Sequence, residues 1–543
     1  MKHWLWPVLL LLTIVLAVLF LFPQISGPSG FTSDLANRPV PIGKGSNNPL
    51  TGAVYLVVID GLRYDISQSS AMPFLRQLRS RSAWGMIRAG VPSYSRSSYE
   101  RLLSGAPNEL TGVMMNDQTT YRQSPVPTIF SLAREAGLQT AASAHFWVRE
   151  LADGPVAGDK TGLVRGKNIT NGYAYLSSDP DARVFAAAKD FIRVNHPALV
   201  MVLSMSVDDI GHQYGGGSSA YRQNATDVDT LLADFFMAIP NGDYLAIVTA
   251  DHGHRNAGGH GGTEASAREV PVFVFGSGVN PGRIKGNIDQ LDIAPTVAAA
   301  LGTPMAGSMA GRVLTEAFTD PAPWRERQKA LTAVQSKYMA ANQDVFGENK
   351  NGSSFGEVWR HARRLALLRR FLWRLPVALL LMAGILFAAV YYARRLQWRL
   401  PMLAGLAFPL YFYAILRLLR YDYSYSAVVS ASDFALRAVL AAALSLFLLT
   451  WAGASLRRGG EPFFWPISLG VWTAQVLFSI LAWSVVGGNF TRFLPDLGWQ
   501  VVLLVQLLVT AIVSTYALAG WVVTGVLTRS RHAKAGVSAN AER

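Results

Sequence analysis

Five long apolar segments occupy the last third of this 543-residue chain, and they constrain its fold more than any other feature. Each segment has about the length that an α-helix needs to cross the hydrocarbon core of a bilayer. Charged residues make up only 15% of the sequence, whereas soluble domains carry about 25%. We therefore expect a C-terminal all-α bundle of about five transmembrane helices over residues 375–527. The segments are 375–393, 401–419, 433–453, 463–486 and 498–527.

A sixth apolar segment lies near the N-terminus, from Trp4 to Phe22. No small-residue cleavage site follows it, because the next residues are Pro-Gln-Ile. We therefore interpret residues 1–22 as an uncleaved transmembrane signal anchor. Residues 23–52 are rich in Gly, Pro, Ser and Asn, which is typical of a linker.

Positive charge accompanies the apolar segments. Residues 353–543 carry 19 Lys and Arg against 6 Asp and Glu, a net charge of +13, so the +14 of the whole chain leaves +1 for residues 1–352. This distribution argues against a nucleic-acid partner and favours a membrane surface. The positive-inside rule places both termini, including the tail at 528–543, in the cytoplasm and residues 23–370 outside it.

The arginines between residues 360 and 374 break that rule, because they would face the extracytoplasmic side. We interpret residues 321–374 as a linker that ends in a basic amphipathic helix lying on anionic lipid.

Short apolar runs alternate with helical stretches between the anchor and the bundle. The runs 54–59, 199–203, 244–249 and 271–275 have the continuous apolar character of buried strands. Helical patterns lie between them, at 128–137 and 181–195. This alternation predicts an α/β domain with a doubly wound sheet over residues 53–320.

Acidic and histidine side chains follow three of these strands. Ligands in open α/β sheets gather at the carboxyl ends of the strands, so we expect these side chains to lie together. A mixed set of Asp and His suits a divalent metal, and zinc above all, when one position stays open for catalysis. The residues are Asp60, Asp208, His212, Asp251, His252 and His260.

A hydroxyl-rich segment, Pro92–Tyr99, supplies a candidate nucleophile. A serine oxygen held at a metal ion loses its proton more easily, and two metals can align the attacking and leaving oxygens of a phosphoryl transfer. The chain has no cysteine, so a thiolate nucleophile and thiolate metal ligands are excluded.

The order and spacing of these motifs resemble the alkaline phosphatase superfamily, in its branch of phosphodiesterases and glycosylphosphatidylinositol ethanolamine phosphate transferases. The resemblance covers about residues 53–320. The stretches that carry it are Val57-Val-Ile-Asp60-Gly-Leu-Arg, Pro92–Gly105, Gly112-Val-Met-Met-Asn116, Asp208–His212, Thr249-Ala-Asp251-His252-Gly, Gly259-His260-Gly-Gly and Gln290–Gly302.

The resemblance implies an alkaline phosphatase-like sheet and two divalent metal ions. Asp60, Ser95, Asp251 and His252 would surround one metal, and Asp208, His212 and His260 would bind the other. Ser95 would be the nucleophile, and Asn116 would donate a hydrogen bond to a non-bridging phosphate oxygen. The diesterases of this branch usually have Thr where Ser95 stands and Pro where Ser97 stands, so this segment departs from their pattern.

Sulfatases share the fold that the resemblance implies, but the sequence does not favour them. Their nucleophile lies in a C/S-x-P-S-R motif, and the segment that begins at Ser95 lacks the Pro and the Arg of that motif.

The remaining histidines of the α/β region have no clear functional pattern. His145 and His196 lack the pattern of the candidate ligands, and His254 either supports a ligand or faces solvent.

Arginines inside the apolar segments point to lipid. Arg437 falls within the span 433–453, and together with Arg417 or Arg420 it could bind a lipid phosphate. An ion pair of Arg437 with Asp433, one turn away, is an equally good interpretation.

The function that follows is a membrane-bound transferase with an extracytoplasmic catalytic domain. A phospholipid such as phosphatidylethanolamine would give phosphoethanolamine to Ser95, and a glycan or lipid hydroxyl would accept it. The alternative is a membrane-anchored phosphodiesterase or phosphatase that uses water. A non-catalytic membrane scaffold would have lost candidate metal ligands, and none of the motif positions lacks one.

Overall fold

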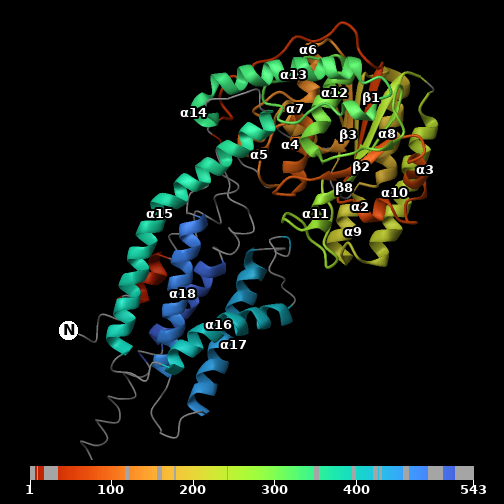
Figure 1. Cartoon of the computed structure of the whole chain (residues 1–543). Coiled ribbons are helices and arrows are strands. Elements are labelled where there is room, and N and C mark those ends of the chain that lie inside the picture. Colours follow the sequence, from red (N-terminus) through yellow and green to blue (C-terminus); the bar gives the residue numbers. More distant parts are fainter. Residues whose placement is uncertain are drawn as a thin grey trace, which may run out of the picture. The chain divides into compact units, whose positions relative to one another are not determined.

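The computed structural model divides into two units, which are described separately. Residues 28–366 belong to an α/β unit, and residues 1–27, 367–489 and 498–543 belong to a helical unit. Figure 1 shows the elements of both. The structure describes residues 7–8, 10–16, 33, 35–116, 121–155, 162–175, 179–240, 242–347, 354–393, 399–419, 426, 431–455, 464–486, 505–519 and 522.

A ten-stranded mixed sheet forms the centre of the α/β unit, with the order β10-β2-β8-β7-β1-β6-β3-β5-β4 and with β9 beside β2. The strands are β1 (Ala53–Ile59), β2 (Ala83–Arg88), β3 (Thr140–His145), β4 (Gly162–Val164), β5 (Asn171–Tyr175), β6 (Leu199–Ser204), β7 (Tyr244–Thr249), β8 (Glu269–Gly276), β9 (Gly282–Arg283) and β10 (Ile288–Asp289).

Helices cover both faces of this sheet. Successive side chains of a strand point to opposite faces, and β6 is buried at every residue, so both of its faces are covered. The helices of the unit are α2 (Tyr64–Ser67), α3 (Pro73–Leu78), α4 (Ser95–Ser104), α5 (Asn108–Thr111), α6 (Ile129–Glu135), α7 (Phe146–Asp153), α8 (Asp181–Asn195), α9 (Ser206–Tyr214), α10 (Ser219–Ala238), α11 (Ala265–Arg268), α12 (Ile293–Leu301), α13 (Ala322–Ala341) and α14 (Gln343–Phe346).

The expected α/β class is confirmed, and the sheet is more mixed than a purely parallel one. The four predicted strands correspond to β1, β6, β7 and β8. β1 pairs in parallel with β6 and with β7, but β8 runs antiparallel to β7. A parallel return needs a crossover of a dozen or more residues that is usually a helix. The 19 residues between β7 and β8 are enough for a crossover, but the one helix among them is the four-residue α11, and the chain turns back beside β7.

The region after residue 320, expected to be a linker, begins with a helix of the α/β unit. α13 spans Ala322–Ala341. Its side chains Trp324, Leu331 and Val334 belong to the main hydrophobic core. A second cluster joins this region to the start of α15 (Phe355–Ala393), because Phe355 and Trp359 are buried with Tyr338 of α13.

The helical unit contains the rest of α15, α16 (Arg399–Leu418), α17 (Ala431–Ser455), α18 (Phe464–Val486) and helical residues 505–519. Of the described residues, Leu400–Leu418 alone form a helix long and apolar enough to cross a membrane. The five-span bundle therefore stays a prediction. Shorter apolar helical stretches are Phe371–Phe387, Leu436–Ala452, Ile467–Leu481 and Val505–Ala519.

The N-terminal segment packs within the helical unit. Residues 10–16 are helical, and Leu10 is buried in a cluster that includes Phe408 and Phe412 of α16. Residues 17–32 of the expected anchor and linker lie outside the described residues.

Candidate metal centre

Three neighbouring strands bring the predicted acidic and histidine side chains to one edge of the sheet. Asp60 directly follows β1, and Asp251 is the second residue after β7. Asp208 lies in the first turn of α9, which begins two residues after β6 ends. Since β6, β1 and β7 are adjacent and parallel, their carboxyl ends meet.

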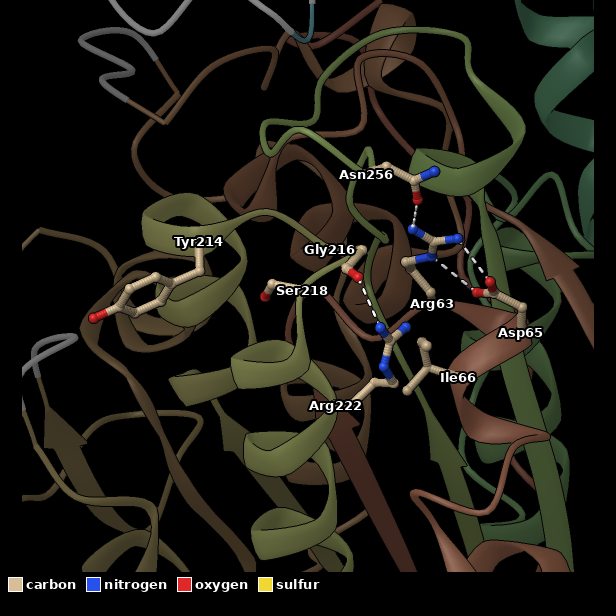
Figure 2. Close-up of a pocket in the computed structure, with 9 residues that line it drawn as sticks. Arg63, Asp65, Ile66, Tyr214, Gly216, Ser218, Arg222 and Asn256 are labelled. Atoms are coloured by element: carbon tan, nitrogen blue, oxygen red, sulfur yellow. Dashed lines mark hydrogen bonds and ion pairs between the residues drawn. The ribbon is translucent and has the colours of Figure 1, made fainter.

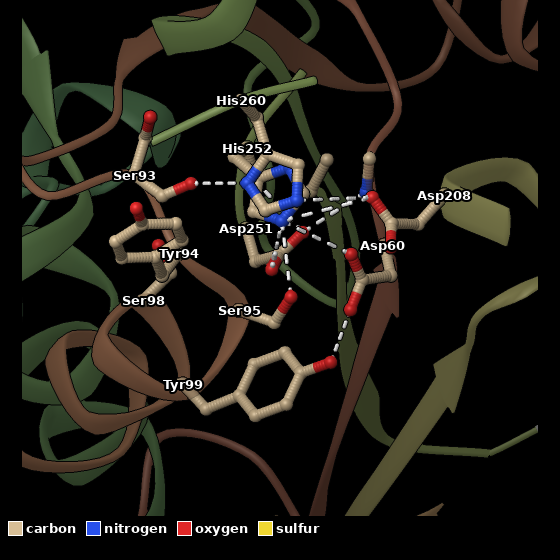
Figure 3. Close-up of polar contacts among 12 residues, drawn as sticks. Asp60, Ser93, Tyr94, Ser95, Ser98, Tyr99, Asp208, Asp251, His252 and His260 are labelled. Atoms are coloured by element: carbon tan, nitrogen blue, oxygen red, sulfur yellow. Dashed lines mark hydrogen bonds and ion pairs between the residues drawn. The ribbon is translucent and has the colours of Figure 1, made fainter. Parts of the chain in front are cut away.

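His252 lies at the centre of this group (Figure 3). Its Nε2 atom is 3.3 Å from Asp60 Oδ1, 3.3 Å from Asp251 Oδ2 and 3.9 Å from Asp208 Oδ1. Its ring stacks on that of His260, with 3.7 Å between the ring centroids. One ligand atom each from Asp60, Asp251 and His252 lie within 4.8 Å of one another. The same is true of a second set, formed by Asp208, His252, His254 and His260.

The other predicted ligands lie beside this second set. His260 Nε2 is 3.6 Å from Asp208 Oδ1 and 3.0 Å from His212 Nε2. His212 Nε2 is also 3.5 Å from Asp208 Oδ2, and the side chain of His212 is 49% exposed. All the other candidate ligands are buried, so His212 is the one that faces solvent.

Of the two interpretations offered for His254, support of a ligand is the one that the structure favours. Its side chain is fully buried, and its Nε2 atom is 2.6 Å from Asp208 Oδ1. Its position two residues after His252 was the one signal in the sequence. That spacing alone does not reveal whether the side chain is buried. The neighbours that bury it, including Gly211 and Gly216, lie about 40 residues earlier in the chain.

Ser95 is the first residue of α4, and Figure 3 shows its side chain pointing toward His252. Ser95 Oγ is 3.1 Å from His252 Nε2. The backbone N–H of Arg96 donates to Asn116 Oδ1 at 3.1 Å, which places Asn116 beside the nucleophile segment. Because its oxygen is used in this way, Asn116 keeps its NH₂ group as a donor.

A buried network ties the nucleophile segment to the metal-site loops. The Arg101 guanidinium donates to Pro92 O at 2.9 Å and to Gln290 Oε1 at 3.0 Å. Gln290 Oε1 also accepts from the backbone N–H of Gly90, and its Nε2 donates to Asp251 O. Gln290 therefore joins the loop before α4 to the loop after β7, a role that no pattern in the sequence revealed.

The carboxylates repel one another in this buried site. Burial, and then the neighbouring Asp251 and Asp208, raise the pKa of Asp60 well above its usual value. Burial and Asp208 raise the pKa of Asp251 to about 7. Burial opposes ionisation of Asp208 as well, but His254, His260 and His212 together outweigh it and hold the pKa of Asp208 well below its usual range.

Burial favours the neutral form of two imidazoles. It lowers the pKa of His260 to about 3, and burial and His260 lower the pKa of His252 well below its usual value. Metal binding requires neutral imidazoles and ionised carboxylates, so these two imidazoles are in the binding form and a bound cation would stabilise ionised Asp60 and Asp251.

The residues present fit a divalent metal. Asp60 Oδ1 and Asp251 Oδ2 are buried and accept no hydrogen bond from any described residue. Buried carboxylate oxygens are normally hydrogen-bonded or paired with a cation. These two oxygens point into the same cluster as His252, where a cation would complete their coordination.

The candidate lipid-contacting arginines lie in the helical unit. Arg437 Nη1 donates to Leu419 O at 2.5 Å, just after the end of α16. Arg417 is exposed on α16. Arg420 and the side chain of Asp433 lie outside the described residues, so the choice between lipid phosphate and ion pair stays a prediction.

The α/β unit is similar in sequence to a known protein family. Residues 54–262 match the family model described as "Type I phosphodiesterase / nucleotide pyrophosphatase". The chain is similar to the catalytic subunit of human GPI ethanolamine phosphate transferase 2, at 23% identity over 317 residues, 54% of this chain and 31% of that protein. GPI ethanolamine phosphate transferase 1 of Aspergillus oryzae matches at 23% identity over 311 residues, 48% of this chain and 29% of that protein.

These matched regions span less than a third of the length of the two curated relatives. Among solved structures, human ectonucleotide pyrophosphatase / phosphodiesterase 5 is similar at a TM-score of 0.42 and 14% identity, over 49% of this chain and 100% of that chain. The family-model match and the similarity to GPI ethanolamine phosphate transferases both support a phosphoryl-transfer enzyme, and the family-model match lies on residues 54–262 of the α/β unit.

Proposed function

We propose that this chain is a membrane-bound, metal-dependent phosphoethanolamine transferase that acts through a covalent Ser95 intermediate. The observation that carries the proposal is the position of Ser95 Oγ, 3.1 Å from His252 Nε2 at the edge of the carboxylate cluster. The similarity to GPI ethanolamine phosphate transferases supports a phospholipid donor and a glycan acceptor.

We propose two divalent cations in the site, and the mixed set of His and Asp ligands suits zinc. Asp60, Ser95, Asp251 and His252 would hold one, and Asp208, His212 and His260 the other, with His254 supporting Asp208. When bound, such cations neutralise the charge that develops on the transferred phosphoryl group.

The residues of the chain perform the remaining tasks. Ser95 Oγ forms a bond to phosphorus while the bond from phosphorus to the diacylglycerol oxygen breaks, and diacylglycerol leaves with the proton that Ser95 gives up. The NH₂ group of Asn116 donates to a non-bridging oxygen during this step. The acceptor hydroxyl then attacks phosphorus, the bond to Ser95 Oγ breaks, and the proton of that hydroxyl returns to Ser95.

The position of Ser95 at the start of a ten-residue helix favours this chemistry. The N-terminus of a helix carries partial positive charge and backbone N–H groups, which stabilise an anionic phosphoryl group. We further propose that this domain is extracytoplasmic and that both termini are cytoplasmic, since the basic loops between the apolar segments follow the positive-inside rule.

Labelled phosphatidylethanolamine, supplied to the purified chain with and without a glycan acceptor, tests the proposal. We expect diacylglycerol release that depends on the acceptor, labelled acceptor as product, and about two equivalents of metal per chain. The Ser95→Ala variant should lose the reaction, and a Ser104→Ala variant at the far end of the same helix should keep it.

A phosphodiesterase that uses water is the second candidate, because the matching family model describes phosphodiesterases. Rapid diacylglycerol release in water, unaffected by acceptor, would establish that alternative and exclude transfer. Undiminished turnover by Ser95→Ala would remove Ser95 from the mechanism in either case.

A further inference from the structure

A polar pocket of about 550 Å³ opens beside the metal-site loops (Figure 2). Three loops build it, and each carries candidate ligands. Arg63 lies three residues after Asp60, Tyr214 ends α9 two residues after His212, and Asn256 follows His254 by two residues. The volume lies within the range of small-ligand sites, which is roughly 300–1,000 Å³.

The pocket is separated from the metal cluster by a single layer of side chains. A Cβ atom on Gly216, in the pocket wall, would lie 2.7 Å from the Cβ atom of His254. His254 in turn contacts Asp208 at 2.6 Å. The backbone N–H groups of Gly216 and Gly217 donate to Arg255 O and Asn256 O, which fixes the two loops against each other.

Arg63 forms a rigid polar wall. Its Nε and Nη2 atoms donate to the two carboxylate oxygens of Asp65 at 2.9 and 2.6 Å, and its Nη1 donates to Asn256 Oδ1 at 2.5 Å. The Arg63 side chain is 11% exposed, whereas that of Asp65 is 60% exposed. The pocket therefore presents an ordered carboxylate and an ordered amide to a ligand.

The opposite side is more open. Arg222 of α10 is exposed and donates to Gly217 O at 3.0 Å, which aims its guanidinium toward the loop. Figure 2 shows this group across the space from Arg63. Tyr214 lies at the rim with 56% of its surface exposed, and Ser218 adds a hydroxyl.

The polar and charged groups that line the pocket favour some classes of ligand over others. Hydrogen-bond donors and acceptors are both present, and the two arginines and one aspartate leave a net charge of only +1. Ile66 is the one aliphatic side chain of the lining, so an acyl chain finds little apolar surface. A free phosphate would meet the exposed Asp65 carboxylate. A neutral polyhydroxyl compound can use both donors and acceptors.

We propose that this pocket is a carbohydrate subsite, which holds a sugar residue of the acceptor next to the metal centre. The assignment rests on the proposed transferase function, because it names the part of the acceptor that the enzyme recognises.

Direct binding to the full-length chain tests the assignment, with no donor present. The probes are neutral trisaccharides of glucose, mannose or N-acetylglucosamine, followed by calorimetry or ligand-observed NMR. We expect at least one trisaccharide to bind. Arg222→Met, at an exposed position, should weaken binding roughly tenfold, as the loss of one charge-assisted hydrogen bond implies.

The matched control is Arg193→Met, at a 75% exposed arginine of α8 that does not line the pocket. It should leave the dissociation constant within about twofold. Failure of all three trisaccharides to bind, or equal weakening by the control, overturns the assignment. Inorganic phosphate that binds with Arg222-dependent affinity, and competes with the sugar, would make the pocket an anion subsite instead.

This experiment is independent of the catalytic test. Sugar binding involves no donor cleavage, so the pocket assignment can fail while acceptor-dependent diacylglycerol release succeeds, and the reverse result is equally visible.

Discussion

Gln290→Met removes the amide that connects the loop before α4 with the loop after β7. Methionine keeps the unbranched shape of the side chain, so the change deletes hydrogen bonds with little loss of volume. Two buried groups lose their partner: the Nε–H of Arg101, at 3.0 Å, and the main-chain carbonyl of Asp251. The N–H of Gly90 is half-buried and can turn to water.

The size of the effect follows from these two groups. Leaving a buried polar group unsatisfied costs about 1–3 kcal/mol, and a charged donor lies at the upper end, so the total is about 3–5 kcal/mol. At about 2 °C per kcal/mol for a unit of this size, the melting temperature should fall by about 6–10 °C. The rate per folded molecule should also fall roughly tenfold or more, because Asp251 and the segment before Ser95 lose their common support.

Thermal unfolding in detergent, followed by tryptophan fluorescence at one scan rate, measures the first quantity, and donor cleavage measures the second. The matched control is Gln223→Met, whose amide makes an exposed contact with Asp227 one turn away on α10. The control should shift the melting temperature by less than about 1 °C. A Gln290→Met protein that melts within 2 °C of wild type with full activity would refute the reasoning.

Two further perturbations test other parts of the molecule. Burial raises the pKa of Glu100 from 4.5 to about 7, so the folded state binds its proton more tightly, and the stabilisation present below pH 4.5 is lost as the pH rises to 7. Glu100→Gln should remove the contribution of Glu100 to this fall in the free energy of unfolding, and at pH 8 denaturant titrations should give the variant a free energy of unfolding about 3 kcal/mol higher. The same pH dependence in both proteins would contradict this. In the helical unit, a Cβ atom on Gly470 would lie 2.0 Å from Pro401 O, whereas one on Gly384 meets no described atom within 4 Å. Gly470→Ala should therefore lower the melting temperature in detergent and Gly384→Ala should not, and equal shifts would argue against close packing of α16 on α18.

Much of the site could be predicted because Asp60, Asp208 and Asp251 lie one, four and two residues after the ends of β1, β6 and β7. A parallel sheet must bring such strand ends together. The sequence left two interpretations open for His254, because its burial depends on Gly211 and Gly216 about 40 residues earlier in the chain. Gln290 reaches Asp251 across 39 residues of chain, and no local pattern encodes such a contact.

In the fold, too, local sequence patterns predicted some features, whereas contacts between distant residues decided others. Local hydrophobic runs located β1, β6, β7 and β8 within two residues at each end. The antiparallel direction of β8 could not be predicted from its own sequence, because the connection from β7 is long enough for either direction and forms only the short helix α11. α13 mixes charged residues with Trp324 and Leu331, so its charge suggested a linker while its apolar stripe packs in the core.

The central position of β1 has a consequence for how the enzyme is made. Val54 pairs with Leu199 on one side and with Leu245 on the other, partners 145 and 191 residues further along the chain. Such distant pairings are slow to form, because a long loop must close before either contact stabilises it. A chain leaving the ribosome therefore cannot assemble the site until β7 has emerged. Ser95 can approach His252 only after residue 252 has emerged, so a chain truncated before β7 contains Asp60 and Ser95 but cannot form the catalytic centre.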